Sequence, residues 1–521
     1  MNRFPGRPAR RTGRESPADG HDRQGDEVAM STVTAAGSEE TNELRPGLGL
    51  EQLLLENPAL RIDQDEYNIN VTANYGEQLS SAQVAQAIQG HPGAGLPAHL
   101  YFHVPLCAYI CHFCNYVKRK IPQGAAREST LQSWTDMLLE ESSRRLVHAP
   151  WIAEAKIESV YLGGGTASLL GTGHLSRLLD HVRGHYSLSE GCEITLEGNP
   201  DNFQRNELAE ACAIGFNRFS VGVQSLQSEV NSFAGRGHDA AMSLHAIDRL
   251  RATTKPFNVD MMFGLPYQTV ETVADDVRRL IELEVPTITI YRLRNADRAK
   301  MNIGNRALWN IDDVKARLHG QGLFPGLVET YRMREAIVEL LLDGDYHPSP
   351  CGWWNRPGTY PGGNIPQVSR NKWQRHDTMI AYGPGAYGWL TGEGDSVVQT
   401  HNIADIPEYT RPLREGTGLP LASGRRLTGY QAIGMVLGFA FKANQPIDAA
   451  RFRRRFGVEL FSDDPFAGAF AELTERGLVK QVAGSAESVM PTLDGEALHE
   501  EIISVYFHQR IGGFSEAVCR R

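Results

Sequence analysis

The segment LYFHVPLCAYICHFCNY, residues 100–116, places Cys107, Cys111 and Cys114 in a C-x3-C-x2-C spacing directly after a predicted strand. Further β-branched or aromatic runs follow along the chain, and helical stretches separate them. Six strand–helix repeats predict a parallel sheet that curls into a full or partial TIM-like (β/α)6 barrel, in which chemistry lies at the carboxyl ends of the strands. The predicted strands are HLYFHV (99–104), ESVYLGG (158–164), EITLEG (193–198), NRFSVGV (217–223), FNVDMMFG (257–264) and TITIYRL (287–293).

The three clustered cysteines indicate a metal site, because seven cysteines are too few for a disulfide scaffold in a chain of this length. Three thiolates can hold three irons of a [4Fe–4S] cluster. With no fourth cysteine close by in the sequence, one iron would stay open to a small chelating ligand. The alternative is a zinc site that His103 or His112 completes, although zinc sites usually come as two C-x2-C pairs and the sequence supplies no second pair.

The chain has 521 residues, with 52 Lys and Arg against 62 Asp and Glu, and a formal net charge of −10. This acidic balance argues against a nucleic-acid-coating role, because phosphate binding needs a basic footprint. No apolar run reaches the roughly 20 residues that span a bilayer. The basic N-terminus has no apolar stretch behind it, as a secretory signal would. We therefore expect a cytoplasmic protein with no nucleic-acid or membrane partner.

Composition divides the chain into four expected regions. Residues 1–48 are rich in Arg, Gly, Ser, Glu and Pro, so we expect a disordered leader. Residues 49–97 are expected to form a helical extension, and residues 98–300 the barrel. Beyond residue 300 the strand–helix alternation weakens, and we expect 301–521 to be a substrate-covering domain. The expected fold class is therefore α/β, a partial (β/α)6 barrel with a mostly helical C-terminal domain.

The cysteine loop after the first strand resembles that of the radical S-adenosylmethionine (radical SAM) superfamily. More narrowly, the chain resembles the oxygen-independent coproporphyrinogen III oxidase family. The resemblance implies a [4Fe–4S] cluster whose open iron chelates SAM, two SAM molecules, a small-molecule substrate and an electron donor such as flavodoxin or ferredoxin. The motifs that carry it are YFHVPLC, YLGGGTASLL, EGNPD, GFNRFSVGVQS, GRGHD, VDMMFGLPYQT and YGPGAYGWL.

The resemblance also implies cofactor contacts. Gly163, Gly164 and Gly165 follow the second strand, where glycine lets the backbone approach a ligand closely. Glu197 ends the third strand, where a carboxylate can bind a ribose hydroxyl or the SAM ammonium. Asp260 lies in an apolar strand, so it needs an Arg partner or a ligand, and we favour the ligand. The other contacts implied are Tyr101 for the first SAM, Phe113, Thr166, Ala167, Gln224 and Arg236 for the second, and Arg294 and Tyr387.

Several departures from the family's patterns bear on which branch of the family this chain resembles. The oxidase usually carries a fourth cysteine two residues after the third, where this chain has Tyr116. The oxidase also has an Arg-Tyr-Thr-Ser-Tyr-Pro-like segment upstream of the cluster, and residues 60–97 contain nothing like it. Heme chaperones of the same family usually have Asp after the third cysteine and a shorter chain, and neither feature fits well.

Three functional hypotheses follow. The first, which we favour, is a radical SAM C-methyltransferase that transfers a methyl or methylene group to an sp2 carbon of a heteroaromatic natural product, with a cyclopropane as one possible product. The second is an oxygen-independent coproporphyrinogen III oxidase or another tetrapyrrole-modifying enzyme. The third is a heme-binding trafficking protein. His376 and Tyr382 are acid–base candidates because they lie near YGPGAYG. The loop 346–362 is either a flat substrate-binding face or a Trp-anchored surface loop; it holds Trp353, Trp354, Arg356 and Tyr360.

Overall fold

The computed structural model describes residues 49–60, 76–114, 116–293, 312–392 and 396–513, which all lie in one compact unit from Gly47 to Arg521. Six strands pair in parallel and in chain order, as the sequence predicts. Each one overlaps its predicted run, so the α/β barrel is confirmed. These strands are β2 (Pro97–Val104), β5 (Lys156–Gly164), β6 (Ser187–Gly198), β7 (Arg218–Gln224), β8 (Phe257–Phe263) and β9 (Thr287–Arg292).

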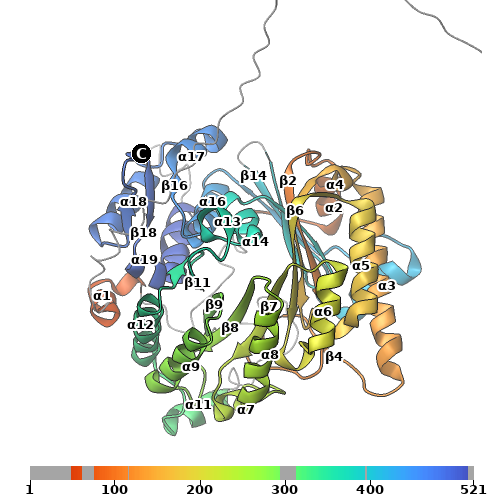
Figure 1. Ribbon diagram of the computed structural model, residues 1–521. Helices are drawn as coiled ribbons and strands as arrows, with labels where there is room; N and C mark the ends of the chain where they lie inside the picture. The colour runs from red at the N-terminus through yellow and green to blue at the C-terminus, as the bar shows by residue number, and fades with distance from the viewer. Residues whose placement is uncertain (1–48, 61–75, 115, 294–311, 393–395, 514–521) are drawn as a thin grey trace, which may run out of the picture. The chain divides into compact units, whose positions relative to one another are not determined.

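Helices cover the outer face of this curved sheet (Figure 1). They begin at recognisable caps: the side chain of Thr269 accepts a hydrogen bond from the backbone of Thr272 at the start of α9 (Val270–Glu282). The largest apolar core lies between these helices and the sheet. The other helices that contribute to this core are α3 (Ala126–His148), α4 (Trp151–Glu154), η4 (Ala167–Leu170), α5 (Gly171–His185), α6 (Arg205–Ile214), α8 (Ala240–Ala252) and α12 (Leu327–Asp343). The short helix η5 (Pro200–Asn202) lies between β6 and α6 in chain order. The helices α7 (Ser228–Phe233) and α11 (Asp312–Gly320) pack in a separate apolar cluster.

The alternation of side chains along β2 separates core from lumen. Leu100 and Phe102 point to the helical layer and belong to the main core. Tyr101 and His103 point the other way, and the Tyr101 hydroxyl lies 2.9 Å from the His103 Nδ1. Because successive strand residues face opposite sides, every second residue of the six strands contributes to a lumen. That lumen holds the polar side chains from which the candidate site is built.

The sheet continues on both sides of the barrel strands. On one side β12 (Thr378–Tyr382) pairs in parallel with β2, and on the other β11 (Trp353–Asn355) pairs antiparallel with β9. Among the described residues the sheet has thirteen strands. The sequence pattern does not predict this extension. The added strands are β1 (Glu77–Leu79), β10 (His347–Pro348), β13 (Tyr387–Thr391), β14 (Ser396–His401) and β15 (Gly424–Thr428).

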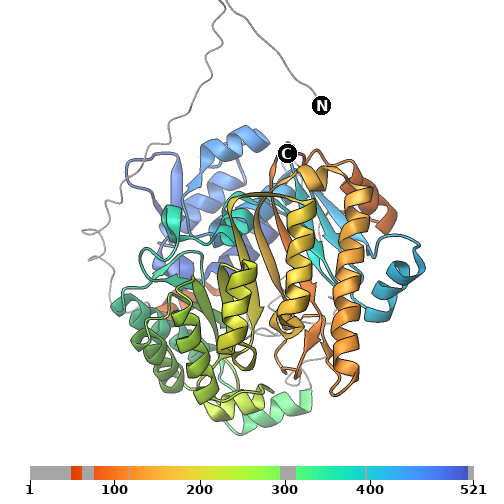
Figure 2. The same cartoon turned by 45° about the vertical axis from the view of Figure 1, so that its right-hand side comes forward.

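Helices and a small sheet follow in the C-terminal part, drawn in blue in Figures 1 and 2. A second apolar core lies between them and β12–β15. Within the described ranges, no helix has the length and apolar character of a membrane span. The remaining elements are α1 (Leu50–Glu56), η2 (Pro58–Leu60), α2 (Ser81–Gln89), α13 (Pro361–Asn364), α14 (Gln367–Ser369), η7 (Arg370–Arg375), α15 (Ile406–Glu415), α16 (Tyr430–Lys442), β16 (Ile447–Asp448), α17 (Ala449–Phe456), α18 (Phe466–Glu475), β17 (Val479–Gln481), β18 (Ser488–Pro491), α19 (Leu493–Ala497), α20 (His499–Ile502) and η8 (Ile503–Ile511).

Candidate active site

The three clustered cysteines are free thiols in one loop after β2. Cys107 ends the short strand β3 (Leu106–Cys107), and the backbone N–H of Cys114 donates to the carbonyl of Cys111 at 3.3 Å. Burial raises the pKa of the Cys107 thiol to about 12, and the nearby Cys114 adds to the effect. The same thiol accepts a hydrogen bond from Thr166, which favours the thiolate. The loop therefore carries three potential metal ligands in one segment at the carboxyl end of β2, although their sulfurs do not all lie within 4.8 Å of one another.

The structure argues against one of the two histidines that would complete a zinc site. His103 has both ring nitrogens engaged: Nδ1 with the Tyr101 hydroxyl and Nε2 with the Val117 carbonyl at 2.7 Å. A ring held in this way has no lone pair directed at the cysteines. The other candidate, His112, is tied through Nδ1 to the carbonyl of Phe233.

The segment GRGHD, residues 235–239, packs on the cysteine loop. The Arg236 guanidinium donates to the Cys111 sulfur at 3.1 Å and to the Asn199 side-chain oxygen at 2.8 Å. A Cβ at Gly237 would lie 2.4 Å from the ring of Tyr109, so only glycine lets the loop come this close. Sequence reasoning assigned Arg236 to the second SAM. The structure adds a direct contact with Cys111.

The glycines after β5 are equally constrained. A Cβ at Gly163 would lie 2.2 Å from the Glu197 carboxylate. One at Gly165 would lie 2.6 Å from the Leu106 carbonyl oxygen and 3.0 Å from the Cys107 sulfur. Gly164, at φ 108°, donates its backbone N–H to Glu197 at 3.2 Å. These glycines thus bring the end of β5 against both the cysteine loop and the buried carboxylate.

Two acidic side chains face the same part of the lumen. Burial raises the pKa of Glu197 to about 8, and the charge of Asp260 adds to this shift. Burial also raises the pKa of Asp260 to about 6, while hydrogen bonds from Ser220 at 3.2 Å and Asn258 at 2.8 Å oppose it. No guanidinium forms a recorded ion pair with Asp260 in the described part of the chain. Its hydrogen-bond partners are neutral donors, and the positive charge of the nearby Arg218 also lowers its pKa.

A buried arginine that sequence reasoning missed lies in the lumen. Arg218 is 1% exposed and donates to Asn258 and, at 3.3 Å, to the Thr195 hydroxyl. Its guanidinium lies 5.2 Å from the ring centre of Trp353, and Tyr360 accepts from it at 3.4 Å. In the sequence, the only indication of a role for this arginine was its position as a cationic side chain at the start of the apolar run RFSVGV. The sequence left open whether the loop 346–362 is a substrate-binding face or a Trp-anchored surface loop. In the structure Trp353 lines the lumen, whereas Trp354 is buried in the main core.

The other predicted cofactor contacts have different surroundings. Ala167 is fully buried in the main core, and Phe113 packs beside a third apolar cluster. Tyr387 contacts Trp389 and His401 in β13–β14. Gln224 is buried at the end of β7, with φ 71°. Arg294 lies outside the described residues.

The two acid–base candidates do not fit that role. Tyr382 is fully buried on the outer side of the sheet, stacks on Phe102 with ring centres 4.9 Å apart, and bonds the Tyr186 hydroxyl. His376 is also fully buried and stacks on Trp389 at 5.1 Å. Burial and the nearby Arg455 and Arg451 hold the pKa of His376 well below its usual value. Proximity to YGPGAYG in the sequence was misleading, because alternate residues of β12 face opposite sides of the sheet and Tyr382 faces the helical layer, whereas His376 follows η7 and packs on Trp389.

A second group of possible metal ligands is better explained as an ion-pair network. Single ligand atoms of Cys351, Glu496 and His499 lie within 4.8 Å of one another. The Arg334 guanidinium already holds Glu496 at 2.6 Å, and the Lys442 ammonium lies 3.4 Å from the His499 Nε2. Because two cationic side chains already lie beside these ligand atoms, electrostatic repulsion disfavours the binding of a metal cation there.

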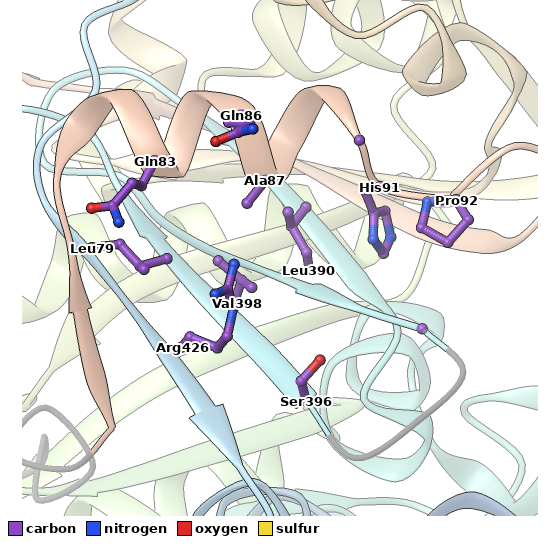
Figure 3. A pocket seen from close by; sticks show the side chains of 12 residues that line it. Leu79, Gln83, Gln86, Ala87, His91, Pro92, Leu390, Ser396, Val398 and Arg426 are labelled. Carbon is purple, nitrogen blue, oxygen red and sulfur yellow. The ribbon is translucent and has the colours of Figure 1, made fainter.

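A cavity of about 480 Å³ lies between α2 and the strands β13–β15, and no predicted site residue lines it (Figure 3). Gln83, His91 and Arg426 are its polar walls. His91 bonds Thr378 at 3.2 Å, and burial lowers its pKa to about 4. The cavity holds no group of side chains comparable with the cysteine loop.

Comparison with known proteins gives the family. The model of the radical SAM superfamily matches residues 101–280. Heme chaperone HemW of Haemophilus influenzae is 33% identical over 333 residues, which cover 61% of this chain and 80% of the chaperone. Oxygen-independent coproporphyrinogen III oxidase of Salmonella typhimurium is 30% identical over 221 residues, 42% of this chain and 46% of the oxidase. The structure of coproporphyrinogen III oxidase from Escherichia coli has the same fold, with a TM-score of 0.65 at 21% identity, covering 85% of this chain and 99% of the enzyme.

These relatives overturn the favoured functional hypothesis. The similar proteins bear the names of heme chaperones and coproporphyrinogen III oxidases, and neither name describes a methyltransferase. The prediction of methyl or methylene transfer to a natural product was wrong, because it was drawn from motifs that are missing rather than from residues that are present. The tetrapyrrole alternatives fit the relatives better.

The cysteine loop, the fold and the relatives agree, and we conclude that the chain belongs to the radical SAM superfamily, whose members use a [4Fe–4S] cluster and SAM, and within it to the coproporphyrinogen oxidase-like family that includes heme chaperone HemW.

Proposed function

We propose that this protein is a tetrapyrrole-handling radical SAM protein of the heme chaperone type. One observation carries the choice within the family: the sequence match covers 80% of the length of a heme chaperone at 33% identity, but only 46% of the length of a coproporphyrinogen III oxidase at 30% identity. The position where the oxidase pattern has a fourth cysteine supports the same choice. It is Tyr116, whose side chain is 61% exposed.

Cys107, Cys111 and Cys114 are the proposed cluster ligands, and the residues around them fit that role. Ligation requires thiolates, and donors directed at two of the sulfurs favour the deprotonated form. Thr166 donates to Cys107 and Arg236 donates to Cys111. When bound, such a cluster supplies the electron that splits SAM into methionine and a 5′-deoxyadenosyl radical.

The lumen next to the cysteines suits a cationic ligand. Glu197 and Asp260 are carboxyls whose pKa values are raised chiefly by burial, while the charges of Arg236 and Arg218 only partly oppose the shifts. A sulfonium and an ammonium group placed between them would lower both pKa values and gain binding energy. We assign Glu197 to a ribose hydroxyl or the ammonium of SAM, and Gly163–Gly165 to close backbone contact. A second SAM molecule beside Gln224 and Asp260 is part of this proposal.

Anaerobic reconstitution followed by heme titration tests the main function. A heme chaperone should bind heme with a saturable change in the Soret band, and Cys111→Ala should lose cluster absorbance. Release of carbon dioxide from coproporphyrinogen III without stoichiometric heme binding would overturn the chaperone assignment. It would favour the oxidase, which the 30% identity over 221 residues of the barrel region keeps as the second candidate. Equilibrium dialysis with labelled SAM gives the number of SAM molecules bound.

A further inference from the structure

A short basic strand lies directly beside the first cluster cysteine. β4 (Arg119–Lys120) pairs in parallel with β3, with Leu106 opposite Arg119 and Cys107 opposite Lys120. Neighbouring strands lie about 4.8 Å apart, so the backbone that carries these cations is adjacent to that of Cys107. In Figure 1, β4 and α7 lie in the same lower part of the molecule. The ligand loop therefore has a cationic edge.

The cations of this edge are available to a partner. Arg119 and Lys120 are both exposed, and neither has a recorded ion pair within the described residues. Lys118 is half-buried and donates to the carbonyls of Cys114 at 2.8 Å and Tyr116 at 3.2 Å.

An exposed aromatic side chain precedes these cations in the chain and lies beside the lumen, with its ring centre 6.4 Å from that of His103. Tyr116 is 61% exposed and is one of four large apolar or aromatic side chains, within the described ranges, that are recorded as exposed. It follows Cys114 by two residues, and its carbonyl is held by Lys118. An exposed tyrosine next to a cationic segment matches the composition of protein interfaces, in which Tyr and Arg are enriched.

We propose that Tyr116, Lys118, Arg119 and Lys120 form the docking face for a small acidic protein that carries one electron, such as a flavodoxin. The proposal rests on the cluster assignment made above. The carrier would be oxidised by one electron, and the centre held by the three cysteines reduced by one. Because the chain has a formal net charge of −10, an acidic carrier is repelled by the molecule as a whole. A local basic face next to the cysteines then selects where it docks.

The test is the double charge reversal Arg119→Glu/Lys120→Glu in the full chain, with Lys255→Glu/Lys480→Glu as the matched control. Lys255 and Lys480 are exposed and lie outside this face, and the control changes the net charge by the same amount. Stopped-flow absorbance follows reduction of the reconstituted protein by flavodoxin hydroquinone. At low salt the rate constant should fall about tenfold or more in the first variant and much less in the control. The difference between the rate constants of the two variants should become smaller as ionic strength rises.

Direct binding provides a readout that does not depend on turnover. Titration with oxidised flavodoxin should show weaker binding to the Arg119→Glu/Lys120→Glu variant than to the control variant. The same difference is expected for the two proteins before reconstitution with iron. Reduction by dithionite should be the same in all three proteins, and wild-type protein that dithionite cannot reduce would refute the cluster assignment instead. Equal flavodoxin affinity and equal rate in both variants would overturn the docking face. If the charge reversal loses its cluster, the neutral variant Arg119→Gln/Lys120→Gln decides by the same binding titration.

Discussion

Replacing Gly165 by Ala should disrupt the cysteine loop without unfolding the protein. The new Cβ would lie 2.6 Å from the Leu106 carbonyl oxygen and 2.8 Å from the Val104 carbonyl oxygen. Ordinary contact begins at 3.4 Å, so the backbone must move by about 0.8 Å. Both obstacles are main-chain atoms of the segment that leads into Cys107, and they have no flexible side chain to rotate away.

The structure sets the expected size of the effect. Overpacking of this kind costs about 1–3 kcal/mol, which is a fraction of the roughly 5–15 kcal/mol that stabilises a folded domain. The fold should therefore survive. A site must be held within about 0.5 Å of its working geometry, so a shift of this size at Cys107 should remove most of the bound iron. SAM cleavage should fall by about 100-fold.

Iron content per chain, SAM cleavage and thermal unfolding, measured after anaerobic reconstitution, check this prediction. Gly184→Ala is the matched control, because Gly184 is an exposed residue of α5 and its added Cβ would meet nothing within 4 Å. The control should keep full iron content and gain slight stability, since alanine favours a helix over glycine. Wild-type iron content and SAM cleavage in Gly165→Ala would refute the close-approach argument.

Four further predictions follow from the same geometry. Cys111→Ala should abolish iron–sulfur absorbance, and full absorbance after reconstitution would refute its role as a ligand. Asp260→Ala should keep the iron but weaken SAM binding about tenfold in equilibrium dialysis, because a charge-assisted contact is lost; loss of the iron would make Asp260 structural. The raised pKa of Glu197 should make the cofactor-free protein lose stability as pH rises from 4.5 to about 8, and melting curves of Glu197→Gln should be flatter across that window. Arg334→Ala leaves the buried negative charge of Glu496 without its ion-pair partner and should lower the free energy of unfolding by about 3–5 kcal/mol. Urea denaturation measures this change, and an unchanged urea midpoint would contradict the prediction.

The errors in the sequence-based assignment have identifiable causes. Tyr382 and His376 were chosen by distance along the chain, but strand alternation turns Tyr382 into the helical layer and stacking holds His376 against Trp389. The functional branch was inferred from missing motifs, which do not specify a reaction. Relatives that share the residues present gave the better assignment.

The sequence by itself determined the six parallel strands and predicted the cysteine loop and the glycine loop as parts of the site, because spacing and periodicity are local properties that a short segment carries with it. Tertiary structure alone decided which distant residues meet. The pairing of β12 with β2, the neutral donors around Asp260 and the buried Arg218 each depend on strand register, and a shift of one residue would turn every side chain of a strand to the opposite face. Register is fixed by packing across the whole sheet, so no stretch of sequence read alone contains it.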